Sequence, residues 1–349
     1  VPVFGGLFYI VGRPRISRRQ RERMSGMAGN FSHIDPGASE PLAKLQQENP
    51  SAAGQSRYIE RCGYCPPYEN TTVEYLPLGE VKFERMLTEL KAAKKFIFLE
   101  YFIIQEGKMW DPILEILEQK VKEGVEVRVM YDDFGCMMTL PARYWGTLEK
   151  KGIQCCVFNP FVPVLSLRFN NRDHRKICVI DGWVGITGGI NLADEYINAY
   201  PKHGHWKDVS ILLKGDAVWG LTKMFLSMWD YLRKIQEDYN DFRPGVVPYA
   251  LPRQPSGYVQ PYSDSPLDDE AVGETVYLNL INKAERYVYI CTPYLIISNE
   301  MITALCTAAK SGVDVRIITP HVADKWYVHA VTRAYYQVLV EAGVKIYEY

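Results

Sequence analysis

The stretch AKKFIFLEYFIIQEGKMWDPILEILEQKVKEGVEVRVMY, residues 93–131, decides the fold because most of its pattern returns later in the chain. Residues 284–318 read AERYVYICTPYLIISNEMITALCTAAKSGVDVRII. Both stretches run from a charged helix end through an apolar strand, a short turn and a helix to Lys-x-Gly-Val and an alternating strand with arginine. Such a repeat indicates that two parts of the chain share one structural unit.

Local patterns within the repeat predict alternating strands and helices. Residues 96–104 are apolar, aromatic and β-branched, as in a buried strand. Pro112 suits the first turn of the next helix, Gly124 suits its end, and residues 125–131 alternate as a strand. Residues 144–158 resemble 335–349, and residues 216–234 predict a core-facing helix. The predicted fold class is α/β, with duplicated α-β-α lobes of which the second is incomplete.

Composition predicts five segments along the chain. Residues 1–12 are apolar but shorter than the ~20 residues of a bilayer span, so we expect the end of a transmembrane helix; a buried N-terminal segment is the alternative. Residues 13–72 are predicted as a basic juxtamembrane segment and linker, although the arginines also fit a disordered arm. Residues 73–243 form the predicted first lobe, 244–261 a proline-rich linker and 262–349 a truncated second lobe. This order predicts a cell-membrane protein with its lobes on the cytoplasmic side.

Charge and cysteine content exclude some function classes. The net charge of −1 argues against a nucleic-acid partner, and therefore against a nuclease. Cys62-Gly-Tyr-Cys65 has no second pair at zinc spacing, so we interpret it as a chance pair in a loop of a reduced protein. No compact acidic and histidine cluster lies near the motif described next, so neither a metal nor another cofactor is predicted.

The predicted chemistry lies in FNNRDHRKICVID, residues 169–181. His174 and Lys176 are two residues apart, which on a strand places both side chains on one face. A phosphodiester requires this pairing, because an attacking group meets phosphorus while a cation holds the non-bridging oxygens. Asp181 falls at odd spacing from both and is expected to orient or support this catalytic group. The alternative is a surface strand with one histidine and solvated charges.

Four further residues are candidates for substrate contact. Gly189 follows Gly188 and permits close backbone approach, and Asn191 can donate to a phosphate oxygen. Glu100 interrupts an apolar strand and is either a site residue or a paired core acid, because an unpaired buried carboxylate is costly. His205 precedes a further strand and is either a substrate contact or an exposed loop residue.

These residues resemble the phospholipase D superfamily, whose signature is His-x-Lys-x4-Asp, and within it the bacterial cardiolipin synthases. The matching strings are LEYFII (99–104), YDDFG (131–135), NNRDHRKICVIDG (170–182), GGINLADEY (188–196), HWKD (205–208) and AGVKIYEY (342–349). The resemblance implies a phosphohistidine intermediate, a second motif whose histidine moves the protons, and no metal. It also implies a membrane phospholipid, phosphatidylglycerol, as both donor and acceptor, with release of glycerol.

A second motif is not found in the 349 residues. His321 and His329 are followed two places later by Ala323 and Val331, where the motif requires lysine. We therefore expect a fragment that transfers slowly by itself, since general acid–base help is worth ~10²–10⁴-fold. Another phospholipase D-type phosphatidyltransferase, a phospholipase acting with water, and a membrane-bound pseudoenzyme are the alternatives.

Overall fold

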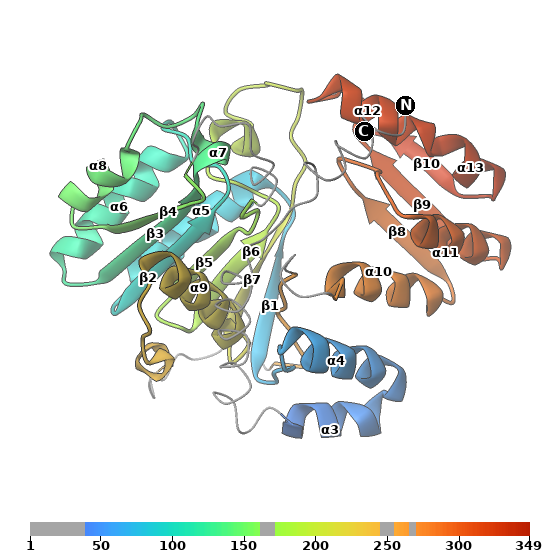
Figure 1. The fold of residues 1–349 in the computed structure, drawn as a ribbon, viewed down its shortest axis with the longest axis horizontal. Helices are drawn as coiled ribbons and strands as arrows, with labels where there is room; N and C mark the ends of the chain where they lie inside the picture. The colour runs from blue at the N-terminus through green and yellow to red at the C-terminus, as the bar shows by residue number, and fades with distance from the viewer. Residues whose placement is uncertain (1–38, 161–171, 245–254, 265–269) are drawn as a thin grey trace, which may run out of the picture. The chain divides into compact units, whose positions relative to one another are not determined.

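The computed structural model describes residues 39–160, 172–244, 255–264 and 270–349, and the chain divides into two compact units (Figure 1). The first unit holds residues up to 201 together with 206–270, and the second holds 202–205 together with 271–349. The predicted membrane segment 1–12 and the arginine run lie outside the described residues. Among the helices that are described, none combines the length and the apolar character needed to cross a bilayer.

The first unit alternates helices and strands as the repeat predicts. In chain order its elements are α3 (Ser39–Glu48), α4 (Pro50–Gly63), β1 (Thr71–Leu76), α5 (Gly79–Ala92), β2 (Phe96–Tyr101), α6 (Trp110–Lys122), β3 (Glu126–Asp132), α7 (Asp133–Cys136), α8 (Tyr144–Lys150), β4 (Gln154–Phe158), β5 (Ile177–Ile180), β6 (Val184–Gly188), the 3₁₀ helix η2 (Asp194–Ile197), β7 (Ser210–Gly215), α9 (Val218–Arg233) and the 3₁₀ helix η3 (Tyr239–Phe242).

The strands of the first unit form one sheet of seven in the order β1-β7-β6-β5-β2-β3-β4. Strands β2, β3 and β4 are parallel because α6 and α8 carry the chain back between them. Strands β5, β6, β7 and β1 continue the sheet in antiparallel pairs. Every residue of β2 is buried, as expected of a central strand covered on both faces.

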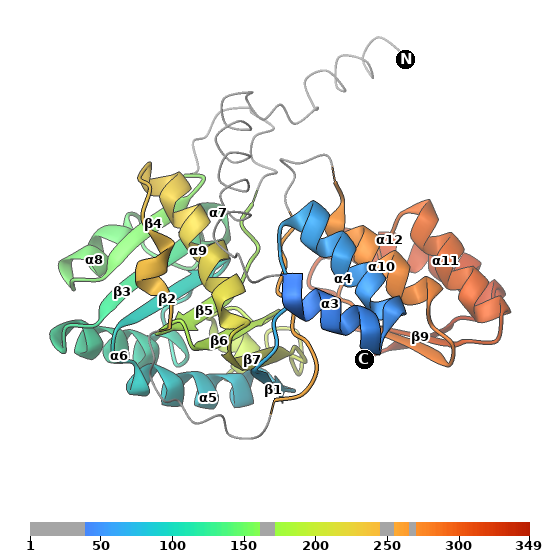
Figure 2. The same ribbon diagram turned by 90° about the horizontal axis from the view of Figure 1, so that it is seen from below.

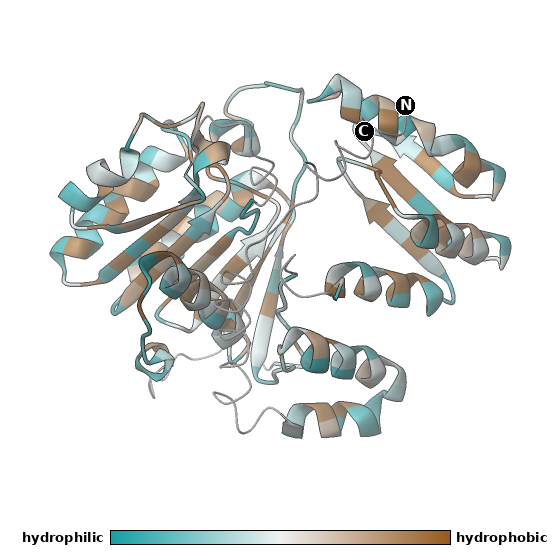
Figure 3. Cartoon of the chain, viewed as in Figure 1, coloured by the Kyte–Doolittle hydropathy of each residue, from teal (hydrophilic) through white to brown (hydrophobic). Residues whose placement is uncertain are grey.

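Helices α5 and α6 cover one face of this sheet, and α9 covers the other (Figure 2). The alternation of β2 assigns its side chains to the two faces: Ile97 and Leu99 join the core under α5 and α6, while Phe96 and Phe98 join the core under α9. The Phe98 ring stacks on Phe225 of α9 with 4.6 Å between centroids. Apolar residues accordingly concentrate on the strands (Figure 3), and each fully buried large side chain stabilises the fold by ~1.5–3 kcal/mol.

The second unit repeats the parallel part of the first. Its elements are α10 (Val272–Asn282), β8 (Tyr287–Cys291), α11 (Asn299–Lys310), β9 (Asp314–Thr319), α12 (Trp326–Ala334), α13 (Tyr336–Glu341) and β10 (Lys345–Glu348). Its sheet has the order β10-β9-β8 and is parallel throughout. Leu305 of α11, Ile317 of β9 and Leu339 of α13 meet in its core. The order β8-α11-β9 reproduces β2-α6-β3, which confirms the duplicated α/β prediction.

Two predicted linkers were wrong in part. Residues 39–63 form α3 and α4, because Asn49 accepts a hydrogen bond from the Ala52 N–H at 3.0 Å and Pro50 stands at the start of α4. The second linker was placed at 244–261, yet Val259 pairs with Tyr68 and residues up to 270 belong to the first unit. The second unit therefore begins at 271 and not at 262.

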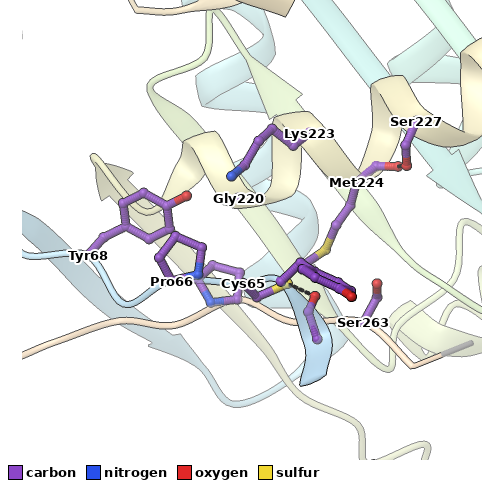
Figure 4. A pocket seen from close by; sticks show the side chains of 11 residues that line it. Cys65, Pro66, Tyr68, Gly220, Lys223, Met224, Ser227 and Ser263 are labelled. Atoms are coloured by element: carbon purple, nitrogen blue, oxygen red, sulfur yellow. Dashed lines mark hydrogen bonds between the residues drawn. The ribbon is translucent and has the colours of Figure 1, made fainter. Parts of the chain in front are cut away.

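The Cys62–Cys65 pair lies at and just after the end of α4. The Cys65 thiol donates to the Gly63 carbonyl at 3.1 Å, and all eight cysteines are free thiols. Cys65 borders a small cavity of about 40 Å³, with Lys223 and Met224 of α9 on the other side (Figure 4). Burial raises the pKa of the Cys65 thiol, which keeps it protonated and unreactive at neutral pH.

Candidate active site

His174 and Lys176 lie in the segment that immediately precedes β5, rather than on the strand itself as predicted. Both side chains nevertheless contact one ring: the His174 ring centroid is 4.8 Å from that of Phe102, and the Lys176 Nζ is 5.4 Å from it. Lys176 Nζ also donates to the His174 carbonyl at 2.5 Å. The imidazole is exposed, whereas Lys176 is 4% exposed. An exposed imidazole thus stands beside a buried lysine.

A second buried lysine lies under the motif. Burial lowers the pKa of Lys176 to about 8 and that of Lys82, on α5, to about 7. Lys82 Nζ donates to the Ile190 carbonyl at 3.3 Å and lies 4.7 Å from the Tyr101 ring centroid. The Asp208 carboxylate acts electrostatically on both lysines, and burial raises its own pKa. Lys82 was not predicted as a site residue, because an α-helix of charged and apolar residues gives no sign that one lysine faces inward.

Asp181 lies at the opposite end of β5 from His174, so the prediction that groups it with the catalytic residues needs correction. Its carboxylate accepts backbone N–H groups from Lys94 at 2.9 Å, Lys95 at 2.7 Å and Phe96 at 3.0 Å. Asp181 therefore fixes the start of β2 against the end of β5. This is a supporting role in the fold, without contact to the imidazole.

Asn191 and Gly189 have their described contacts within the protein. The Asn191 amide oxygen accepts the Ile103 N–H at 3.0 Å, and its Nδ2 donates to the Tyr196 hydroxyl at 2.7 Å. A Cβ at position 189 would come within 2.2 Å of the Asp208 carboxylate, so glycine is required for close packing there. Their contact with substrate stays a prediction.

Glu100 is a paired core acid, which is the second of the two predicted alternatives. It is 0% exposed, and its Oε1 lies 2.7 Å from Arg175 Nη2. Arg175 Nε also donates to the buried Asp173 carboxylate at 3.0 Å. Glu100 has no exposed surface in this structure, and its direct contact with substrate stays a prediction. Asp173 and Arg175 flank His174 in the motif and were not predicted as site residues.

A further buried acid anchors the segment before the motif. Asp132 ends β3, is fully buried, and accepts the Asp173 N–H at 3.1 Å and the Gly135 N–H at 3.0 Å. Arg172 Nη1 lies 3.5 Å from the same carboxylate. These contacts hold residues 172 and 173, and so determine where the chain presents His174. The acidic pair in YDDFG was the available signal for this residue.

His205 is grouped with the second unit and not with His174. Its Nδ1 lies 2.9 Å from the Tyr349 hydroxyl oxygen, inside that unit. The contact of His205 with substrate stays a prediction.

A cavity of about 350 Å³ adjoins the motif within the first unit. Residues 174–177 and residues 259–264 line it, together with residues of β6, β7 and α9. Ile211 and Leu213 of β7 and Leu221 and Met224 of α9 supply apolar surface. As for metals, no three His, Cys, Asp or Glu side chains gather into a possible metal site in the part of the chain that the structure describes.

Comparisons with known proteins agree with this geometry. A family described as cardiolipin synthase, PLD-like domain, matches residues 86–229 and 277–349. A cardiolipin synthase of Geobacillus kaustophilus is 33% identical over 100% of this chain and 69% of its own length. An uncharacterised protein of Streptococcus mutans is 51% identical over 88% of this chain and 66% of its own length. The chain thus spans about two thirds of the length of these relatives.

One solved structure supports the fold. The crystal structure of phosphatidylserine synthase from Haemophilus influenzae matches with a TM-score of 0.53 at 14% identity, over 76% of this chain and 66% of that one. The family model and the relatives together decide to which family the chain belongs. The chain belongs to the cardiolipin synthase family of phospholipase D-like phosphatidyltransferase enzymes.

Proposed function

We propose that this chain carries the phosphohistidine-forming half of a cardiolipin synthase that acts on phosphatidylglycerol. The observation that supports it is the exposed imidazole of His174 beside the buried ammonium of Lys176. An imidazole nitrogen of His174 would form a bond to the donor phosphorus while the bond from phosphorus to the glycerol oxygen breaks. Glycerol would leave with one added proton. The hydroxyl of a second phosphatidylglycerol would then attack phosphorus, lose its proton and break the phosphorus–nitrogen bond.

Lys176 supplies the positive charge that this sequence of steps requires. Its lowered pKa of about 8 still leaves the ammonium mostly protonated at pH 7. The ammonium is held in place by the His174 carbonyl and by the electrostatic effect of three nearby carboxylates, from Asp173, Asp208 and Asp132. A charge fixed in a largely buried position stabilises negative charge on phosphate oxygens more than a mobile surface lysine does.

The leaving glycerol also needs a proton donor. The 349 residues contain one His-x-Lys-x4-Asp motif, and the relatives are longer than this chain. We propose that the matching acid–base histidine comes from a second motif, and that these 349 residues alone transfer ~10²–10⁴-fold more slowly than an enzyme with both. The reaction would take place at the cytoplasmic face of the cell membrane, where the lipid and the basic run at residues 13–23 would meet.

Hydrolysis is the second candidate. The exposure of His174 favours it, because water can reach a phosphohistidine unless the site is closed. A phospholipase would release phosphatidic acid and glycerol from phosphatidylglycerol, whereas a cardiolipin synthase would release cardiolipin and glycerol. The two reactions therefore differ in one lipid product.

The test is to incubate the chain with phosphatidylglycerol vesicles labelled in the acyl chains and to measure three products: phosphohistidine, cardiolipin and phosphatidic acid. We expect acid-labile label on the wild-type protein, and its loss in His174→Ala. His329→Ala, which changes a histidine outside the motif, is the matched control. Label that persists in His174→Ala would refute the proposed nucleophile, and phosphatidic acid without cardiolipin would replace the synthase with a hydrolase.

A further inference from the structure

Arg175 lies between His174 and Lys176 and is fixed by two buried acids. Its Nη2 is 2.7 Å from Glu100 Oε1, and its Nε donates to Asp173 Oδ1 at 3.0 Å. Glu100 has no exposed surface and Asp173 is nearly as buried. Throughout the part of the chain that the structure describes, Arg175 Nη1 makes neither a hydrogen bond nor an ion pair. One edge of the planar guanidinium is anchored, and the other retains its donors.

Two buried acids of different acidity contact the Arg175 guanidinium. Burial raises the pKa of Glu100 well above its ordinary value. Burial also acts to raise the pKa of Asp173, but the Arg175 charge and the hydrogen bond with Glu100 lower it overall. These opposite shifts favour one negative charge beside the guanidinium over two, which lessens the repulsion of an anionic ligand.

Arg175 also lines the 350 Å³ cavity beside the motif. That volume falls near the lower end of the range for small-molecule sites, about 300–1,000 Å³. Leu213 and Met224 contribute to the apolar part of the wall, and Tyr262 and Asp264 also line the cavity. The cavity offers a cation near the nucleophile, apolar walls and polar groups, which fits a phosphorylated glycerol with the first part of its acyl chains.

The proposed reaction places two phosphates in one site. Two phosphodiester charges repel each other strongly at the distances that a shared glycerol imposes, so each requires a compensating cation. Lys176 serves the donor phosphate, which His174 attacks. An anchored arginine suits the acceptor phosphate, because its planar fork matches phosphate oxygens and little conformational entropy is lost on binding.

We propose that Arg175 binds the phosphate of the acceptor phosphatidylglycerol in this cavity, and thereby selects a phospholipid over glycerol or water as the acceptor. The proposal rests on the proposed function. It assigns to Arg175 the recognition of the acceptor, separately from the chemical steps at His174.

The experiment compares three acceptors with one labelled donor lipid: phosphatidylglycerol, soluble glycerophosphoglycerol, and labelled glycerol, which lacks a phosphate. For Arg175→Gln we expect kcat/KM for both phosphate-bearing acceptors to fall at least tenfold relative to glycerol exchange. Arg175→Lys keeps the charge without the fork and should recover part of the loss. An equal loss with all three acceptors would reduce Arg175 to a positioning residue for His174, and a loss confined to the lipid acceptor would show contact with acyl chains; either result overturns the proposal.

A binding measurement separates this proposal from the proposed function. Titration calorimetry with glycerophosphoglycerol, which needs no turnover, should give a Kd that weakens at least tenfold in Arg175→Gln. Glu100→Gln, which preserves the shape of the anchor and cannot ionise, should weaken binding less. Arg175-dependent binding without any transfer would refute the transferase and retain the phosphate site. Binding that is indifferent to Arg175 would refute the site even in an active transferase.

Discussion

Replacing Asp181 should destabilise the first unit strongly, because one carboxylate holds three backbone N–H groups. Oδ1 accepts from Lys95 and Phe96, and Oδ2 accepts from Lys94. A hydrogen bond to a charged group contributes ~1.5–3 kcal/mol, and donors that lose their partner in a partly buried place keep the desolvation cost. We expect Asp181→Ala to lower the free energy of unfolding by about 3–5 kcal/mol, after allowance for non-additivity.

Two further substitutions divide this effect into its parts. Asp181 has a φ of 54°, in the left-handed region that asparagine and glycine tolerate better than alanine. Asp181→Asn keeps one acceptor oxygen and the backbone preference, so it should cost about 1–3 kcal/mol. Asp181→Gly removes all three hydrogen bonds but relieves the backbone, and should be more stable than Asp181→Ala by ~1 kcal/mol.

The assay is urea unfolding followed by tryptophan fluorescence. Six of the seven tryptophans belong to the first unit, with Trp326 the exception, so the signal reports mainly on the unit that contains Asp181. Phosphohistidine formation is measured on the same samples under folded conditions. The reasoning fails if Asp181→Asn unfolds within ~0.5 kcal/mol of the wild type while phosphohistidine formation is lost, because that pattern belongs to a chemical role.

Two more predictions concern the core and the buried lysine. Leu99→Ala, at a fully buried position of β2, should lower the free energy of unfolding by ~2–5 kcal/mol. The control Met138→Ala changes a side chain that is 87% exposed and should lower it by ~0.5 kcal/mol or less. Equal urea midpoints for the two variants would contradict this prediction. Burial lowers the pKa of Lys82 from 10.5 to about 7. Between these two pH values the lysine is protonated in the unfolded chain and neutral in the folded chain. The free energy of unfolding should therefore rise with pH by up to ~1.4 kcal/mol per pH unit. Lys82→Met should flatten that rise between pH 7 and 10, and an unchanged slope would show that Lys82 stays charged.

The sequence predicted the elements that short-range patterns determine. The repeat located β2-α6-β3 and β8-α11-β9, and helical spacing located α9, because each signal comes from residues within one or two turns of each other. The helices α3 and α4 were missed for a physical reason. Their sequence is rich in glycine, serine and proline, and Ala53, Ser56 and Ile59 form a weak buried stripe that became visible only with its packing partners.

Only the two motif residues of the site could be predicted from the sequence. His174 and Lys176 came from their spacing, and both indeed lie against Phe102. The roles of the other polar residues depend on partners far away in the sequence. Asp181 meets residues 94–96, and Glu100 meets Arg175. No local pattern encodes such pairs, because they depend on which strands become neighbours in the sheet.

The repeat also identifies what differs between the two units. Tyr287 and Tyr289 of β8 occupy the positions of Phe96 and Phe98 in β2, and they are 56% and 55% exposed where the phenylalanines are buried under α9. The substitution agrees with this exposure, because a tyrosine keeps its hydroxyl in water while its ring packs on a neighbour. Arg316 lies 4.9 Å from the Tyr289 ring centroid, as Arg128 lies 5.2 Å from that of Phe98. The strand frame and its arginine are shared, whereas α9 has no counterpart among the described residues of the second unit.

The same alignment separates the frame from the site. Glu100 corresponds to Cys291 in the second unit, which is exposed and carries no acid. A buried carboxyl group lowers stability unless it is paired, so the strand itself does not require an acid at the position of Glu100. Glu100 is retained in the unit that also has Arg175, and the two meet at 2.7 Å. The acid is therefore best explained by the arginine that it anchors beside His174, and a variant with both residues replaced, Glu100→Cys with Arg175→Gln, should fold at least as stably as Arg175→Gln alone.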